Sequence, residues 1–229
     1  MMEITEKGAI IRMFRVHKRY GAKQALVDAT LDIAKHEFLF ISGPSGAGKS
    51  TLLKLLYLAE PVSEGQILVD GMNLSRISRH RIPMLRRKFG IIFQDYKLIP
   101  TRTVYENVAL VLEALGRRRS LIEKKVKNVL RVVGMEDRLG AYPPSLSGGE
   151  QQRVAVARAV AGDPKIILAD EPTGSLDDDS AAIILELLGM FHNRGATVVV
   201  ATHDRALIES ATGRVLQIRQ GRLDMPADI

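Results

Sequence analysis

A glycine-rich stretch that ends in a lysine and two hydroxyls has the residue types and spacing of a phosphate-binding loop. Its members are Gly43, Pro44, Ser45, Gly46, Ala47, Gly48, Lys49, Ser50 and Thr51. Glycines let successive backbone N–H groups curl around an anion, and a helix beginning near the lysine would aim further N–H groups at it. Lys49 adds a full positive charge for the β- and γ-phosphates, and the Ser50 hydroxyl can join the shell of a bound Mg²⁺. The stretch therefore predicts a site for a nucleoside triphosphate.

Two carboxylates, Asp170 and Glu171, follow the apolar run 166–169. Ligands of open α/β sheets sit at the carboxyl ends of strands, so we expect these acids to face the phosphates. Asp170 would hold Mg²⁺ directly or through water, and Glu171 would polarise the attacking water. For an isolated Asp-Glu-Pro, two solvated acids opening a turn at Pro172 would be the better interpretation; the complete phosphate loop upstream favours the chemical one.

Gln94 and His203 also follow strand-like runs. The neutral amide of Gln94 could coordinate Mg²⁺ or the water without adding charge. The imidazole of His203 could contact the γ-phosphate or orient the water. A lone glutamine is usually a surface residue, and a lone histidine is more often structural. Only their positions after strand-like runs favour a role at the site for Gln94 and His203.

The stretch 146–153, Leu-Ser-Gly-Gly-Glu-Gln-Gln-Arg, predicts a second anion site. Ser147 with Glu150 fits a helix capping box, which is the plainer interpretation. However, Gly148 and Gly149 in a first helical turn cost about 1 kcal/mol each against alanine. What they provide is an open helix end with bare N–H groups. Because Lys49 already holds one nucleotide, a second site suggests a nucleotide held between two chains.

An α/β core with an inserted helical lobe must position these residues. We expect strands at 10–16, 25–33, 38–41, 66–69, 90–93, 165–169 and 197–201, and a closing hairpin at 213–218 and 221–223. Helices are expected from Lys49, near Pro83 and over 178–193. Ser or Thr three residues before Glu predicts further capping boxes at Thr103 and Ser120. The expected organisation is a flexible extension at 1–9, a core at about 10–94 and 163–229, and a helical lobe at about 95–162.

Composition limits the classes of protein. The 229 residues are 46% hydrophobic and 26% charged, with no cysteine and a net charge of +7. Disulfides and thiolate metal sites are therefore excluded. No apolar run reaches the roughly 18–20 residues of a membrane span, and the first residues lack the apolar core of a secretory signal, so we expect a cytoplasmic location. The positive charge calls for an anionic partner but suits nucleic acid, lipid and nucleotide equally.

Taken in order, the motifs resemble those of the ATP-binding cassette ATPases over about residues 10–223. Tyr20 matches the aromatic that stacks on adenine, 43–51 matches Walker A, Gln94 the Q-loop, 146–151 the signature, 166–171 Walker B, 175–177 the D-loop and His203 the switch histidine. The resemblance implies a RecA-like mixed sheet, an antiparallel β subdomain and an inserted helical subdomain. It also implies a head-to-tail homodimer that binds two ATP with Mg²⁺. Ser147, Gly148 and Gly149 of one chain would then meet the γ-phosphate held by the other, with Glu171 as base.

Two kinds of cassette remain, one coupled to a separate membrane protein and one working on nucleic acid. The long coiled-coil or zinc insertions usual in the nucleic-acid kind are missing, so we expect a polytopic membrane partner, the inner face of the cytoplasmic membrane and no nucleic acid. Details at 81–87, 92–95, 102–108 and 146–153 most resemble the bacterial cell-division cassettes, with the lipoprotein-release and macrolide-export cassettes as the alternative. Ser175 departs from the asparagine common in the cell-division group. Tyr96, Leu98 and Ile99 could form an apolar patch that contacts the membrane partner, but ordinary packing within the loop explains them equally well.

Overall fold

The computed structural model describes residues 8–204, 207–208 and 213–224. The chain forms two compact units, Met1–Arg86 with Thr197–Ile229, and Arg87–Ala196. Most of the expected extension at 1–9 lies outside the described residues, although Ala9 already opens the first strand.

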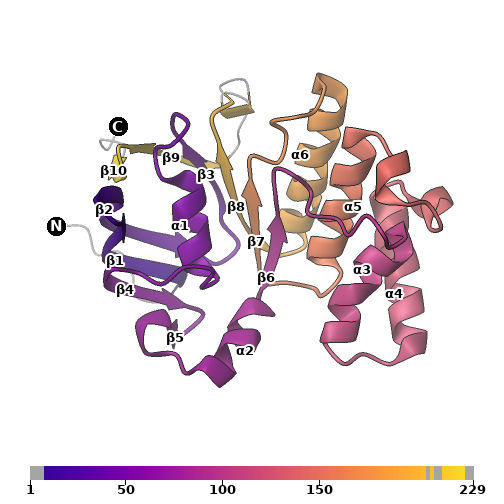
Figure 1. Ribbon diagram of the computed structural model, residues 1–229, viewed down its shortest axis with the longest axis horizontal. Helices are drawn as coiled ribbons and strands as arrows, with labels where there is room; N and C mark the ends of the chain where they lie inside the picture. The colour runs from indigo at the N-terminus through magenta and orange to yellow at the C-terminus, as the bar shows by residue number, and fades with distance from the viewer. Residues whose placement is uncertain (1–7, 205–206, 209–212, 225–229) are drawn as a thin grey trace. The chain divides into compact units, whose positions relative to one another are not determined.

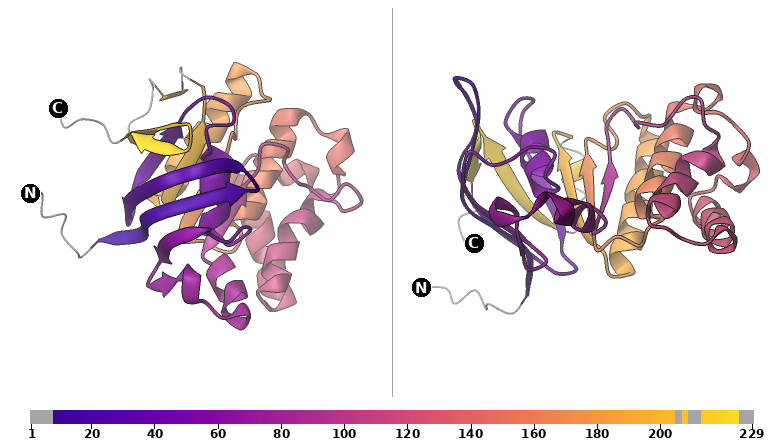
Figure 2. Two further views of the ribbon diagram at one scale, coloured as in Figure 1. Left: turned by 60° about the vertical axis from the view of Figure 1, so that its left-hand side comes forward. Right: turned by 60° about the horizontal axis from the view of Figure 1, so that its bottom comes forward.

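The first unit contains an antiparallel sheet in the order β2-β1-β4-β5. Its strands are β1 (Ala9–Tyr20), β2 (Lys23–Ala34), β4 (Glu64–Val69) and β5 (Met72–Asn73). The long hairpin of β1 and β2 turns at Gly21, whose φ of +57° suits glycine, and it is prominent in the left view of Figure 2. The expected strands 10–16 and 25–33 are confirmed, but both continue to the turn because cross-strand pairing reaches Tyr20 and Lys23.

The same unit contains parallel strands that carry the phosphate-binding loop. Strand β3 (Phe38–Ser42) pairs in parallel with β8 (Thr197–Thr202) and with β9 (Arg214–Arg219), which turns back into β10 (Arg222–Asp224). Strands β3 and β8 are nearly continuous apolar runs, as buried parallel strands usually are. Helix α1 (Lys49–Leu56) follows β3 after the phosphate-binding loop and buries Leu52, Leu53, Leu55 and Leu56. The short helix α2 (Ile82–Arg86) begins one residue before Pro83, in agreement with the expectation.

The second unit pairs two parallel strands with four helices. Strand β6 (Phe89–Ile92) lies beside β7 (Ile166–Asp170), with Ile92 opposite Ala169. The helices are α3 (Val104–Ala114), α4 (Arg119–Val132), α5 (Gly148–Val160) and α6 (Asp178–Asn193), and α3 packs against both α4 and α5 (Figure 1). A Cβ on Gly90 would lie 2.4 Å from the Ala159 carbonyl oxygen, so α5 approaches β6 as closely as glycine permits.

The capping predictions have a mixed outcome. Thr103 caps α3 and Ser147 caps α5, each in a full capping box with the glutamate three residues on. The capping box expected at Ser120 is wrong. The Arg118 carbonyl already accepts from the N–H groups of Leu121 and Ile122, so Ser120 lies inside α4, and Glu123 pairs with Lys127 at 2.7 Å instead. Within the described residues, no helix is long and apolar enough to span a bilayer.

Candidate functional site

The phosphate-binding loop joins β3 to α1 in the conformation that its glycines allow. Gly48 caps α1 with φ +117°, and a Cβ there would lie 2.5 Å from the Ala25 carbonyl oxygen. A Cβ on Gly43 would lie 2.3 Å from the Ile218 carbonyl oxygen. The N–H of Gly221 donates to the Ala47 carbonyl at 2.9 Å, so the β9–β10 turn also braces the loop. The backbone is therefore held on two sides by neighbouring strands, and side chains at these glycines would displace it.

The Lys49 side chain folds back onto its own loop. This side chain is buried, and Nζ donates to the carbonyl oxygens of Gly43 at 2.7 Å and Pro44 at 3.3 Å. Ser45 and Gly46 are exposed, and Ser50 and Thr51 lie half-buried in the first turn of α1. The ammonium is thus fixed above the N-terminal end of α1, where an anion is favoured by both the charge and the helix dipole.

His203 lies beside the loop in the same unit. It follows the end of β8 and is exposed, and together with Gly43, Pro44 and Ser45 it lines an open pocket of about 810 Å³. The volume is within the usual range for ligand sites. The structure thus brings together the loop and the histidine, which are more than 150 residues apart in the sequence.

Tyr20 ends β1, also in the first unit, and its side chain is 42% exposed. The Lys18 ammonium lies 4.7 Å from the centroid of the Tyr20 ring, over one face. No sequence motif singles out Lys18. The two-residue spacing within a strand was a usable signal, because it puts both side chains on one face.

Gln94, Asp170 and Glu171 gather at one edge of the second unit. The parallel pairing of β6 with β7 brings Gln94 and Glu171 to the same end of adjacent strands. A Cβ on Gly174 would lie 3.7 Å from both Gln94 Nε2 and Glu171 Cβ, so the two side chains flank this glycine. Asp170 is half-buried and Glu171 is 9% exposed with φ +47°, an uncommon backbone conformation for a glutamate. A buried carboxylate on a strained backbone has the chemistry needed to polarise a water.

The start of α5 carries the second predicted anion site. The Glu150 N–H donates to Ser147 Oγ at 3.2 Å, and the Ser147 N–H donates to a Glu150 carboxylate oxygen at 2.8 Å. The latter bond holds the pKa of Glu150 below its usual value. Ser147 is exposed. Gly149 is buried, and packing also favours a glycine here, since a Cβ would lie 2.5 Å from Ser180 Oγ on α6.

Residues around 94–97 and 175 are linked to α5 through side chains. The Tyr96 hydroxyl is 3.1 Å from Ser175 Oγ, and a Cβ on Gly148 would lie 2.9 Å from that same hydroxyl. Arg158 of α5 donates to the carbonyl oxygens of Tyr96 and Lys97, both of which have positive φ. Burial lowers the pKa of the Arg158 guanidinium. Tyr96 is therefore engaged within its own unit, which favours loop packing over partner contact for this side chain.

The residues suited to Mg²⁺ carry hard oxygen donors: the Ser50 hydroxyl in the first unit, and the Asp170 carboxylate and Gln94 amide in the second. Across the part of the chain that the structure describes, no group of three or more His, Cys, Asp or Glu could hold a metal. Magnesium rarely needs such a cage, because it usually keeps several waters and takes one or two carboxylates together with substrate phosphates. Each of these donors is of the type that Mg²⁺ takes when it is carried with a triphosphate.

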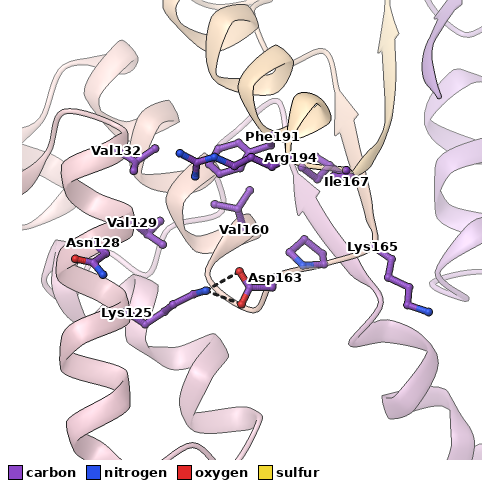
Figure 3. A pocket seen from close by; sticks show the side chains of 13 residues that line it. Lys125, Asn128, Val129, Val132, Val160, Asp163, Lys165, Ile167, Phe191 and Arg194 are labelled. Carbon is purple, nitrogen blue, oxygen red and sulfur yellow. Dashed lines mark hydrogen bonds and ion pairs between the residues drawn. The ribbon is translucent and has the colours of Figure 1, made fainter. Parts of the chain in front are cut away.

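A separate pocket in the second unit contains none of these residues. It has a volume of about 390 Å³, between α4, the end of α5, the start of β7 and the end of α6 (Figure 3). Its apolar lining includes Val129, Val160 and Phe191, and Lys125 bridges to Asp163 at its edge.

Residues 26–174 match the family model described as ABC transporter. The chain belongs to the ABC transporter family. This confirms the resemblance read from the motifs, and as a cassette of this family the chain is an ATPase with the α/β fold of phosphate-loop NTPases.

Curated relatives point to one group of cassettes. The chain is 45% identical over 215 residues to the cell division ATP-binding protein FtsE of Escherichia coli K12. The aligned residues cover 93% of this chain and 97% of that protein. It is 43% identical over 213 residues to FtsE of Bacillus subtilis 168, covering 93% of each. The sequence-based similarity to cell-division cassettes is therefore confirmed.

Solved structures agree with the fold. The dimeric ABC transporter cassette MJ0796 superposes with a TM-score of 0.86 at 36% identity, covering 94% of this chain and 97% of that one. The same cassette in a dimeric post-hydrolysis state bound to ADP and phosphate gives a TM-score of 0.84 at 34% identity, covering 96% and 100%. A cassette so similar to this chain has thus been seen both as a dimer and with the products of ATP hydrolysis.

Proposed function

We propose that this cassette hydrolyses ATP as a head-to-tail dimer, with each nucleotide held between the phosphate-binding loop of one chain and the start of α5 of the other. The observation that carries this proposal is the exposed Ser147 at the capped, glycine-rich beginning of α5. Such a helix end attracts an anion, while the chain's own triphosphate site is already built around Lys49. The dimeric state of the similar cassette MJ0796 supports the same arrangement.

Within this arrangement each predicted residue has one task. Tyr20 stacks on the base, residues 43–51 wrap the phosphates, and Lys49 neutralises the β- and γ-phosphate charge. Glu171 accepts a proton from the attacking water, while Gln94 and His203 orient that water and the γ-phosphate. Ser147, Gly148 and Gly149 donate to the γ-phosphate from the partner side, so hydrolysis and phosphate release remove the group that joins the chains.

We infer that Mg²⁺ binds with the nucleotide at Ser50, Asp170 and Gln94. When bound, the ion neutralises phosphate charge and polarises the phosphoryl oxygens. The protein residues hold these oxygens in place and exclude water from the other faces of the phosphate.

The work driven by hydrolysis is, we propose, that of the cell-division cassettes. The similarity to FtsE of two bacteria supports this role. In it, the dimer sits on the inner face of the cytoplasmic membrane against a polytopic FtsX-like protein and transmits its closing motion across the membrane to septal peptidoglycan hydrolases. A nucleotide-binding subunit for lipoprotein release or macrolide export is the alternative.

Affinity purification of the tagged chain from detergent-solubilised cells tests the membrane-coupled role. We expect a polytopic membrane protein with an extracytoplasmic domain to co-purify, and more of it with the Glu171→Gln chain in the presence of ATP. Salt-dependent binding of DNA or RNA with no membrane protein would contradict the proposal. Co-purification of a complete solute or lipoprotein exporter would favour the alternative.

A further inference from the structure

Lys18 is a charged side chain to which the proposed function gives no task, yet it is only 6% exposed. An ammonium so deeply buried is costly unless it is paired. Its neighbours are specific: Nζ donates to Glu60 Oε2 at 3.0 Å and to the Pro61 carbonyl at 2.9 Å, and it lies 4.7 Å from the centre of the Tyr20 ring. Lys18 therefore joins the loop after α1 to one face of the aromatic residue.

The surrounding bonds keep this arrangement in place. The Ser63 N–H donates to the His17 carbonyl at 2.9 Å, and the Arg19 N–H donates to Ser63 Oγ at 3.0 Å. The loop after α1 is thus tied to the end of β1 on both sides of Lys18. Because α1 itself begins at the phosphate-binding loop, the part of the chain that holds Tyr20 is connected to the part that holds the phosphates.

We propose that Lys18 is a positioning residue for the nucleobase, a role that rests on the proposed stacking function of Tyr20. The ammonium covers one ring face and fixes the ring, which leaves the other face of this 42% exposed side chain for a base. A cation on one face also draws π electrons toward itself, so the opposite face repels the π cloud of a stacked purine less. Lys18 acts on the base through Tyr20 and does not touch the phosphates.

Calorimetric titration with two ligands, Mg-ATP and Mg-tripolyphosphate, separates this role from a general structural one. In Lys18→Met we expect the affinity for Mg-ATP to fall by about 3- to 30-fold, the range of a cation–π contact. The affinity for tripolyphosphate should change by less than about 2-fold, because this ligand has no base to stack. Lys18→Arg should restore ATP binding, since a guanidinium also stacks on tyrosine. Arg19→Met, which removes an exposed neighbouring cation, is the matched control and should change neither affinity.

A double-mutant cycle that combines Lys18→Met with Tyr20→Ala measures whether the two residues act on ATP affinity together. The proposal predicts that Lys18→Met has no further effect on ATP once the ring is gone. Equal losses for ATP and tripolyphosphate, no loss for either, or an undiminished loss without the ring would each overturn it. Should Lys18→Met not fold, Lys18→Gln keeps a hydrogen-bond donor without the charge and carries the same expectation. If Tyr20→Ala alone leaves ATP affinity unchanged, the stacking role of Tyr20 is at fault, and the inference falls with it.

Discussion

At the scale of single residues, the chemistry depends on two groups whose surroundings are unusual. Lys49 is a buried cation held by two carbonyl oxygens of its own loop, and Glu171 is a nearly buried carboxylate on a left-handed backbone. Both arrangements are costly in isolation, and such costs tend to be found at functional sites.

Lys49→Ala should weaken ATP binding by about 10- to 100-fold, because charged hydrogen bonds to the phosphates are lost in a partly dry site. Equilibrium titration with a fluorescent ATP analogue measures this. Lys54→Ala, an exposed lysine on the same helix, is the control and should bind normally. Equal affinities for all three chains would rule out the phosphate role of Lys49.

Glu171→Gln should lower the rate of ATP hydrolysis by about 10²- to 10⁴-fold while leaving ATP affinity unchanged, since the amide cannot accept the proton of the attacking water. Steady-state phosphate release, measured beside nucleotide titration, makes the distinction. Glu186→Gln, on the exposed side of α6, should behave as the natural chain. Normal ATP hydrolysis by the Glu171→Gln chain would show that another residue is the general base.

Residue types and spacing pointed to the phosphate-binding loop, to Asp170 and Glu171 and to the start of α5, because phosphate and metal chemistry permit few substitutes, whereas Tyr20 followed from the resemblance to ABC cassettes. They did not identify Lys18 or Arg158. The role of Lys18 depends on its contact with the Tyr20 ring. The role of Arg158 depends on its hydrogen bonds to the carbonyl oxygens of Tyr96 and Lys97. Only the folded chain shows the latter contact, since 61 or more residues separate the partners.

At the scale of helices and strands, capping explains both a correct and an incorrect expectation. Thr103 and Ser147 are followed three residues later by glutamate and cap their helices. Ser120 has the same spacing but lies inside α4, because Arg118 is the N-cap of this helix and Lys127 attracts Glu123. A local pattern fails where a competing i, i+4 pair is available.

These caps give a matched pair of substitutions. Thr103→Ala should lower the free energy of unfolding by about 1 kcal/mol, because the Glu106 N–H loses its acceptor. Ser120→Ala should leave it within about 0.5 kcal/mol, since no cap is lost and alanine suits a helix interior. Chemical denaturation compares the two. A larger loss in Ser120→Ala would contradict the helix boundary.

Acidification should weaken the starts of α3, α5 and α6, the last of which is capped by Asp177. Glu106, Glu150 and Asp177 each accept a backbone N–H at a helix start, and these bonds hold each pKa below its usual value. Their contribution to stability is therefore complete above the unfolded-state pKa of about 4 and is lost as the pH falls through the lower folded-state values. Melting temperatures between about pH 5 and pH 3 should fall less steeply in a Glu106→Gln, Asp177→Asn chain than in the natural one. Parallel pH profiles would show that these bonds contribute nothing.

At the scale of the whole molecule, the predicted site residues belong to two compact units. Tyr20, Lys49 and His203 lie in the first, and Gln94, Ser147 and Glu171 in the second. This division does not follow the order of the motifs along the chain, because packing between segments distant in the sequence sets the limits of a unit. The exposed position of Ser147 meets a condition of the proposed dimer, since a buried serine could reach no second chain.

Light scattering coupled to size-exclusion chromatography of the Glu171→Gln chain tests the shared nucleotide site most directly. Without nucleotide we expect the monomer mass of 25.3 kDa, and with Mg-ATP we expect twice that mass and two bound ATP. Adding Ser147→Arg should keep the chain monomeric while each chain still binds ATP at its own Lys49 site, because only the contact with the partner's phosphate is lost. A double variant that dimerises with ATP as readily as Glu171→Gln alone would contradict the account.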